Sequence, residues 1–379
     1  MSTWPAEPVA ATPSDALPPF AVGPDLARRL RLVTRTAILA VLFVHSYNLG
    51  SRFAAGENTA AAPGAPGPVG FVEYLVAQAL CRWPAALLFA VSGFLFFRDL
   101  DGGADALRAK LRRRLRTVLL PFLLWSALGL LAYAAARLAP GGGRLLASGG
   151  AGGLDTAGAL RLLLWQPVAY PLWFLQTLLT CFALSPLLLP AARRLRWAAA
   201  TPFLACWLAG APASDWTQWK GLAFFSLGAV LALELRAGRR LPLFRAAPAV
   251  LPLAWLAACL LFTFLLRDQG TWWAALLHKG MMTLGVVAVW VGYPVHLRRL
   301  EGWRPLRLLL PYGFFIYAAQ EPLLSAVKRA LLLAGEAGDG ALLAAFFVAP
   351  LLTLLATWAT AAGLRRLTPR PYALLTGGR

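Results

Sequence analysis

A single histidine, His45, lies deep in an apolar run that follows a cluster of arginines. The run, RRLRLVTRTAILAVLFVHSYN, covers residues 28–48. An ionisable side chain inside a membrane span is costly to bury and usually has a functional role. A neutral imidazole can take a proton from a sugar hydroxyl or attack a thioester itself. We predict that His45 is catalytic; the alternative is a histidine that only hydrogen-bonds a neighbouring helix.

A second charge, Arg82, lies eleven residues into the next apolar run, 71–97. Its side chain either reaches back to the outer interface or orients a carboxylate, phosphate or hydroxyl near His45. A basic loop is expected to follow over residues 98–116, which carry seven lysines and arginines. Such a polycation binds either anionic lipid headgroups or the phosphates of a nucleotide-bearing acyl donor such as coenzyme A.

The sequence offers no ligand set for a metal ion. Its four cysteines fall inside apolar runs without a CxxC spacing, and its three histidines are isolated from one another. We therefore expect no metal, no disulfide framework and no bound cofactor. The formal charge of +20 comes from clusters at the ends of apolar runs, not from one soluble face. This placement predicts membrane orientation, not nucleic-acid binding.

The composition identifies the class of protein. Hydrophobic residues make up 59% of the 379, charged residues only 14%, and the mean hydropathy is +0.64. Soluble domains contain about 25% charged residues, and a helix needs about 20 apolar residues to cross a membrane. We predict an all-α integral membrane protein with about ten transmembrane helices. The expected spans are residues 30–50, 71–97, 117–136, 168–190, 198–213, 221–235, 248–266, 274–295, 308–332 and 341–363.

The distribution of basic residues predicts the orientation of these spans. Six segments on one side hold 26 of the 36 lysines and arginines, so both termini are expected in the cytoplasm. Residues 1–27 are rich in alanine and proline and are expected to form a disordered cytoplasmic tail. The membrane domain then covers 28–366, and 367–379 form a short cytoplasmic tail. The amphipathic segment 138–166 is expected to lie along the interface.

Six stretches together carry a family resemblance. They are AILAVLFVHSYN, RWPAALLFAVSGFLFF, RRRLRTVLLPFLLW, PLWFLQTLL, FFSLGAVLA and LPYGFFIYAAQEPLL. In this order, along nearly the whole chain, they resemble the acyltransferase 3 family of bacterial multi-pass membrane acyltransferases. The resemblance implies ten core spans in the inner membrane. It also implies transfer of an acyl group from cytoplasmic acyl-CoA as co-substrate to a cell-surface or lipid-linked glycan. In the family this group is commonly acetyl and sometimes succinyl, and acetyl is expected here.

The resemblance also implies roles for single residues. By position, His45 corresponds to the family's catalytic histidine, and Arg113 and Arg116 to arginines associated with donor binding. The family usually has an arginine eleven residues before the histidine, where this chain has Thr34. Eleven residues return to nearly the same helix face, whereas ten miss it by about 80° and fourteen by about 40°. Either Arg35 or Arg31 therefore takes this role.

A second departure lies near the end of the chain. The family's late motif usually carries a histidine where this chain has Gln320. Glutamine donates and accepts hydrogen bonds but cannot carry a proton at neutral pH. Gln320 is therefore expected to position substrate, or the adjacent Glu321 has taken up a role.

We predict a membrane-bound acyltransferase that interacts with lipids, acyl-CoA and a glycan acceptor. One alternative is a transporter or flippase of an anionic lipid-linked substrate, which would use the same histidine and arginines for binding. A second alternative is a non-catalytic relative of the enzyme, which the departures at Thr34 and Gln320 make conceivable.

Overall fold

The computed structural model describes residues 23–47, 67–100, 103–138, 155–239, 248–267, 270–334 and 338–378. These ranges are helical, with no strand and one isolated β-bridge, Ser214–Thr217. The predicted disordered tail lies outside them up to residue 22, and the first helix begins at Pro24. Proline at the first helical position and Asp25 in the first turn favour a helix start here.

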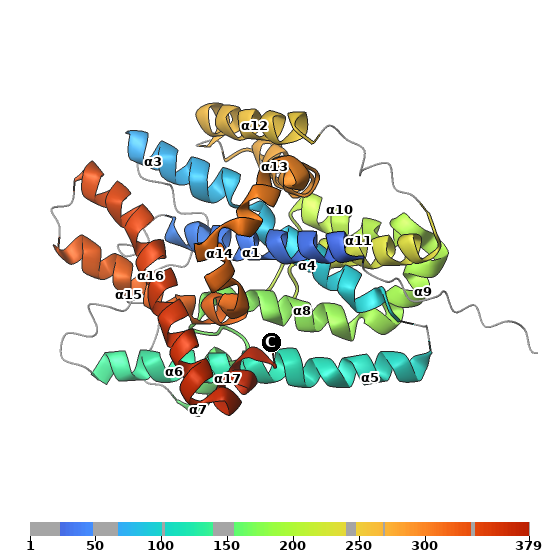
Figure 1. Ribbon diagram of the computed structural model, residues 1–379, viewed down its shortest axis with the longest axis horizontal. Coiled ribbons are helices and arrows are strands. Elements are labelled where there is room, and N and C mark those ends of the chain that lie inside the picture. The colour runs from blue at the N-terminus through green and yellow to red at the C-terminus, as the bar shows by residue number, and fades with distance from the viewer. Residues whose placement is uncertain are drawn as a thin grey trace, which may run out of the picture.

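Most helices run roughly parallel to one another (Figure 1). Helix α1 packs against α4, α15 and α16, so its central place brings residues far apart in sequence to His45. The α-helices are α1 Pro24–Ser46, α3 Gly67–Tyr74, α4 Trp83–Phe97, α5 Ala104–Arg114, α6 Leu120–Leu138, α7 Thr156–Leu164, α8 Trp173–Ala183, α9 Ser185–Leu195, α10 Thr201–Ala209, α11 Trp219–Arg236, α12 Val250–Leu266, α13 Trp272–Gly292, α14 Arg304–Leu309, α15 Gly313–Ala334, α16 Asp339–Leu367 and α17 Pro369–Thr376.

Each of the ten predicted spans contains helix, but fewer helices meet the requirements for crossing a membrane alone. Four are long and apolar enough in the described ranges, and a fifth is possible if the bent pair Tyr170–Ala183 and Ser185–Ala209 forms one span. The pair is bent by 65°. Helix α10 has only nine residues, about 14 Å, against a hydrocarbon core of about 30 Å. The four are Gly67–Phe97, Ala104–Ala135, Trp272–Gly302 and Asp339–Leu367.

The expectation of a basic loop over residues 98–116 is wrong for most of that segment. Helix α5 occupies Ala104–Arg114 and continues through a π-helical turn, Leu115–Leu119, into α6 (Figure 1). Alanine, leucine, lysine and arginine are all strong helix formers, so the charges did not prevent a helix. The basic side chains are consequently held in fixed register on a rigid element.

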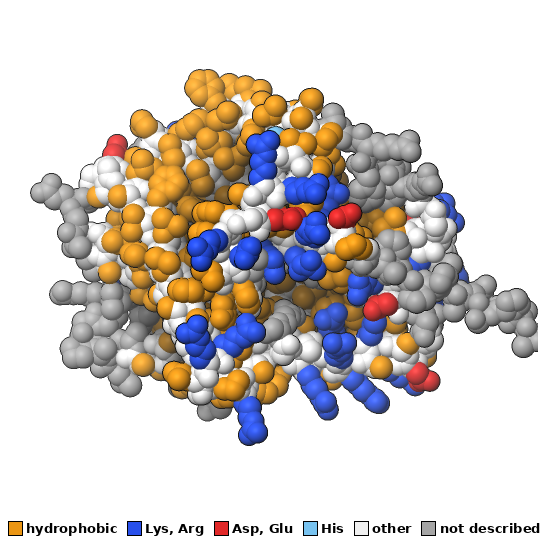
Figure 2. Space-filling view, viewed as in Figure 1, with side chains coloured by type: hydrophobic (Ala, Val, Ile, Leu, Met, Phe, Trp, Pro, Cys, Tyr) orange, Lys and Arg blue, Asp and Glu red, His pale blue; other side chains and the backbone are white. Residues whose placement is uncertain are grey.

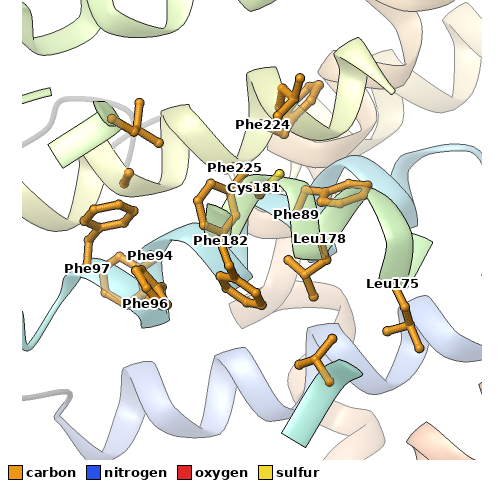
Figure 3. Packing of buried hydrophobic residues seen from close by; sticks show 14 of the residues in the cluster. Phe89, Phe94, Phe96, Phe97, Leu175, Leu178, Cys181, Phe182, Phe224 and Phe225 are labelled. Carbon is orange, nitrogen blue, oxygen red and sulfur yellow. The ribbon is translucent and has the colours of Figure 1, made fainter. Parts of the chain in front are cut away.

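The core is aromatic and lies where α4, α8 and α11 meet (Figure 3). The rings of Phe96 and Phe182 lie 5.0 Å apart, and those of Phe182 and Phe225 lie 5.7 Å apart in an edge-to-face arrangement. Phe89 from α4 is fully buried against Phe174 at 4.3 Å. Such pairs add about 0.5–1.5 kcal/mol each beyond the burial of their area. This cluster fixes α4, and therefore Arg82 at its start, relative to α8 and α11.

Two glycines allow α4 and α11 to cross closely. A Cβ atom on Gly93 would overlap the carbonyl of Phe225, and one on Gly228 would overlap the carbonyl of Ala90. The obstructing atoms are backbone, so a methyl group could be accommodated only by separating the helices. The SGFL stretch therefore has a packing role here, as small residues do at membrane helix contacts.

We expect Gly93→Ala to destabilise the protein by about 1–3 kcal/mol, because the added methyl group overpacks this crossing. The matched control is Gly280→Ala, since Gly280 lies in α13 with open space around it. The control should be neutral or slightly stabilising because alanine favours helix over glycine. Thermal unfolding of the two purified variants in detergent checks this; an equal melting temperature for both would contradict the packing role.

Candidate active site

His45 lines a small cavity between α1, α4, α8, α11 and α15. The residue is 6% exposed, and its ring meets Tyr170 edge-to-face with 5.3 Å between centroids. The cavity volume is about 60 Å³. Its lining is Val41, Val44, His45, Gln78, Cys81, Arg82, Pro84, Ala85, Leu88, Tyr170, Pro171, Trp173, Phe174, Lys220 and Tyr317.

The end of α1 that carries His45 is held from two neighbouring helices. Lys328 of α15, buried to 2% exposure, donates a hydrogen bond to the backbone carbonyl of His45. Ser46 donates to the carbonyl of Phe346 on α16 at 2.9 Å. The bond from Lys328 satisfies a carbonyl near the end of α1, and the two bonds together fix the position of His45.

Arg82 reaches the same cavity because the helix before it is broken. A π-helical turn, Leu75–Leu80, ends at Cys81, and α4 starts at Trp83 with Pro84 in its first turn. Arg82 lies at this junction, where the backbone changes direction. The structure thus brings together His45 and Arg82, the two intramembrane charges that the sequence singled out.

Lys220 is a third charged group in this cavity, and sequence reasoning missed it. It comes from the first turn of α11, and its ammonium lies 5.3 Å from the ring centre of Trp173. The positive charge of Arg82 acts on Lys220 electrostatically. The available signal was a lysine directly before an apolar run, in SDWTQWK. No aspartate or glutamate is among the residues that line the cavity.

A larger basic cavity of about 490 Å³ opens beside α1, toward the start of that helix. Three arginines line it, Arg31 and Arg35 from α1 and Arg114 from α5, and its lining contains no carboxylate. Arg114 also packs over the ring of Phe182 at 5.0 Å. The face shown in Figure 2 carries many lysine and arginine side chains over its centre and lower right, whereas its upper left is largely apolar. A cavity whose only charged side chains are cationic is suited to a ligand with an anionic group.

The C-terminal helix α17 forms part of the wall of the larger cavity. Tyr372 and Thr376 line it, and Trp125 on α6 fixes the helix by donating to the carbonyl of Leu375 at 3.0 Å. The Tyr372 hydroxyl is buried without a hydrogen-bond partner in the described ranges. Burial raises the pKa of Tyr372, so the phenol stays protonated and can donate to a ligand. The sequence suggested only a tail here.

The two cavities meet. The residues that line both of them are Val41, Leu88, Phe174 and Tyr317, so these four side chains form a wall that the two cavities share. The Tyr317 hydroxyl donates to the carbonyl of Pro171, which fixes one of these four residues. Along α1, Arg31 precedes His45 by fourteen residues, or about 21 Å at 1.5 Å per residue. The arrangement can hold an elongated molecule with an anionic head and a small reactive end.

The structure places the other predicted donor-binding arginines outside the cavities. Arg113 and Arg116 are exposed and line neither one, whereas Arg114 between them does. Both Arg31 and Arg35 line the larger cavity, so the structure does not choose between them. The roles of Arg31, Arg35, Arg113 and Arg116 remain predictions.

Gln320 and Glu321 line neither cavity. Gln320 is fully buried, and neither polar atom of its side chain has a partner in the described ranges. Helix α15 is kinked at Glu321, whose carboxylate accepts a hydrogen bond from the Ser325 hydroxyl at 2.7 Å. His278 lines neither cavity, but one of its ring nitrogens lies 2.7 Å from the carbonyl of Gln78, a residue that lines the small cavity. The substrate roles proposed for Gln320 and Glu321 remain predictions.

The described residues contain no group of three or more His, Cys, Asp or Glu that could hold a metal ion.

Comparison with known proteins identifies the family. A profile described as an acyltransferase domain, that of the acyltransferase 3 family, matches residues 36–362. The chain therefore belongs to the acyltransferase 3 family of enzymes. It is also similar to the succinoglycan biosynthesis protein ExoH of Rhizobium meliloti (strain 1021), with 31% identity over 166 residues. This match covers 43% of the chain and only 42% of that relative. No solved structure matches significantly.

Proposed function

We propose that this protein transfers an acyl group from acyl-CoA to a hydroxyl of a cell-surface or lipid-linked glycan, in the bacterial inner membrane. The observation that carries the proposal is the pair of adjoining cavities, with arginines in one and His45 in the other. A glycan acceptor is supported by the similarity to a succinoglycan biosynthesis protein. The ten-span layout with both termini in the cytoplasm is part of this proposal.

The larger cavity would hold the donor. Coenzyme A carries phosphates at one end and its sulfur at the end of a long flexible arm. Arg31, Arg35 and Arg114 would bind the phosphates, since guanidinium groups match phosphate oxygens in geometry and charge. Tyr372 would donate a further hydrogen bond from α17. The arm would then pass Leu88 and Phe174, which separate the cavities, and bring the thioester to His45.

His45 would act in one of two ways. As a general base, it accepts the proton of the acceptor hydroxyl while that oxygen attacks the thioester carbonyl carbon. The new C–O bond forms, the C–S bond breaks, and the CoA thiolate leaves with the electron pair and takes up the proton. As a nucleophile, the imidazole first receives the acyl group, releases CoA, and then passes the acyl group to the acceptor oxygen. Both routes give an ester and free CoA.

Mass spectrometry of surface glycans tests the function in cells. Cells that express the chain should carry an ester-linked acyl group that cells lacking the gene do not, and re-expression should restore it. If the glycans are acylated identically but differ in amount at the surface, the transporter alternative is favoured. No difference in either property would contradict the proposal.

A further inference from the structure

We propose that Lys328 is a positioning residue for acyl transfer, which holds the imidazole of His45 against Tyr170 from a distant helix. The inference rests on the proposed function and adds to it a residue that lines neither cavity. Lys328 lies in α15, 283 residues after His45, and is 2% exposed. A charge buried inside a membrane span is costly, and such side chains pair with one another or with backbone carbonyls.

The carbonyl of His45 needs a donor from outside its own helix. Helix α1 ends at Ser46, and Tyr47 after it has an extended backbone, with φ −66° and ψ 148°. The last four carbonyls of a helix have no N–H partner within the helix, and the carbonyl of His45 is one of them. The Lys328 ammonium donates to it, and a cation is also favourable at this end of the helix dipole. Lys328 therefore caps α1 at the residue that carries the imidazole.

A kink in α15 separates the part that carries Lys328 from the part before it. Glu321 has a non-helical backbone, with φ −111° and ψ 136°, and Pro322 follows it. The second part thus starts as a new helix does, with proline in its first turn. The Glu321 carboxylate accepts hydrogen bonds from the N–H and the hydroxyl of Ser325, at 3.3 and 2.7 Å. These bonds give the start of the second part its own support.

The two parts of α15 hold the two rings that meet in the small cavity. Before the kink, the Tyr317 hydroxyl donates to the carbonyl of Pro171, which follows Tyr170 in the same 3-10 turn. After the kink, Lys328 donates to the carbonyl of His45. The same helix therefore supports both sides of the contact between the His45 and Tyr170 rings, whose centroids lie 5.3 Å apart. Without the bond from Lys328 the end of α1 could shift, and a displacement of about 1 Å can cost about a hundredfold in rate.

Kinetics of Lys328→Met, with the purified full chain in nanodiscs, tests the proposal. Release of CoA from acetyl-CoA and from succinyl-CoA is measured with an extract of the glycan acceptor and expressed per CoA-binding site. We expect kcat to fall at least about tenfold for the donor that the wild type uses, because the imidazole is displaced. The KM for this donor and the Kd of CoA should change less than about twofold, since Lys328 lines neither cavity. Lys328→Arg keeps a cationic donor and should lose less of kcat.

The matched control is Lys279→Met. Lys279 of α13 also donates to a carbonyl of another helix, that of Leu208, but lines neither cavity and makes no bond to α1 in the described ranges. This variant should keep kcat within about twofold of the wild type. A loss as large as that of Lys328→Met would overturn the proposal, because any lysine between helices would then have the same effect.

A double-mutant cycle with His45→Ala shows whether Lys328 acts through the imidazole. In the His45→Ala background, Lys328→Met should change the residual rate less than about twofold, because no imidazole is left to position. The proposal would be overturned by an unchanged kcat in Lys328→Met, by an equal loss of kcat and CoA binding, or by an equal loss in Lys328→Arg. The full loss repeated in the His45→Ala background would overturn it too. A wild type that releases CoA from neither donor would instead contradict the proposed function.

Discussion

A His45→Ala variant is expected to lose acyl transfer by at least about a hundredfold while it still binds CoA. Removal of a general base typically costs about 10²–10⁴ in rate, and loss of a covalent nucleophile costs at least as much. Binding should persist because the arginines that would hold the phosphates line the other cavity. Release of CoA from acyl-CoA, measured with purified protein and an extract of the glycan acceptor, checks the rate.

The same variant separates the enzyme from its alternatives. A transporter would keep moving its substrate with reduced affinity, and a non-catalytic relative would leave glycan acylation unchanged. Either result would contradict the assignment of His45. The intact mass of the wild type after mixing with acyl-CoA, without acceptor, distinguishes the two chemical routes. An added acyl group that is absent from His45→Ala would indicate the covalent route, and no added group would indicate the general base.

Arg114→Gln is expected to raise the KM for acyl-CoA by at least about tenfold with a smaller change in kcat. A hydrogen bond to a charged group contributes about 1.5–3 kcal/mol, and a phosphate left without its guanidinium loses this amount from binding. The effect should fall mainly on KM because Arg114 lines the larger cavity, whereas His45 lines the smaller one. Steady-state kinetics with varied acyl-CoA measures both constants.

Arg113→Gln provides the matched control, since it removes the same charge from the adjacent residue. Arg113 is exposed and lines neither cavity. The KM of the Arg113→Gln variant for acyl-CoA should therefore change less than about threefold, because only the long-range attraction between the protein and the anionic donor is weakened. Equal effects of the two substitutions on KM would mean that binding of acyl-CoA depends on the total charge of α5 and not on the position of Arg114. A larger effect at Arg113 would support the role that the family resemblance implies for it and contradict the placement of the donor.

The sequence predicts the helical class well because long apolar runs leave few alternatives in a membrane. It is less informative about how many helices cross. The predicted span 168–190, for example, is divided at Leu184 into two helices of eleven residues, α8 and α9. Such a break depends on the packing around Leu184, which the apolar sequence does not indicate. The short α10 likewise reads as an ordinary apolar run in sequence.

The candidate site was predictable in part. His45 and Arg82 are ionisable residues inside apolar runs. Such residues are rare in membrane spans, so the sequence alone identifies them as candidates. The choice of Arg114 over its neighbours depends on the rotation of α5 before the π-helical turn at Leu115–Leu119. Lys220 enters the cavity because of the way α11 packs against α4, a long-range contact that its own sequence neighbours do not indicate.

Photocrosslinking with an acyl-CoA that carries a diazirine in its acyl group tests most directly whether a donor held by the arginines reaches His45. We predict adducts on residues of the small cavity, such as Tyr170 and Leu88, that excess CoA suppresses and that Arg114→Gln weakens. Adducts confined to exposed apolar residues of α12, or adducts in the small cavity that CoA does not displace, would contradict a donor path through the two cavities.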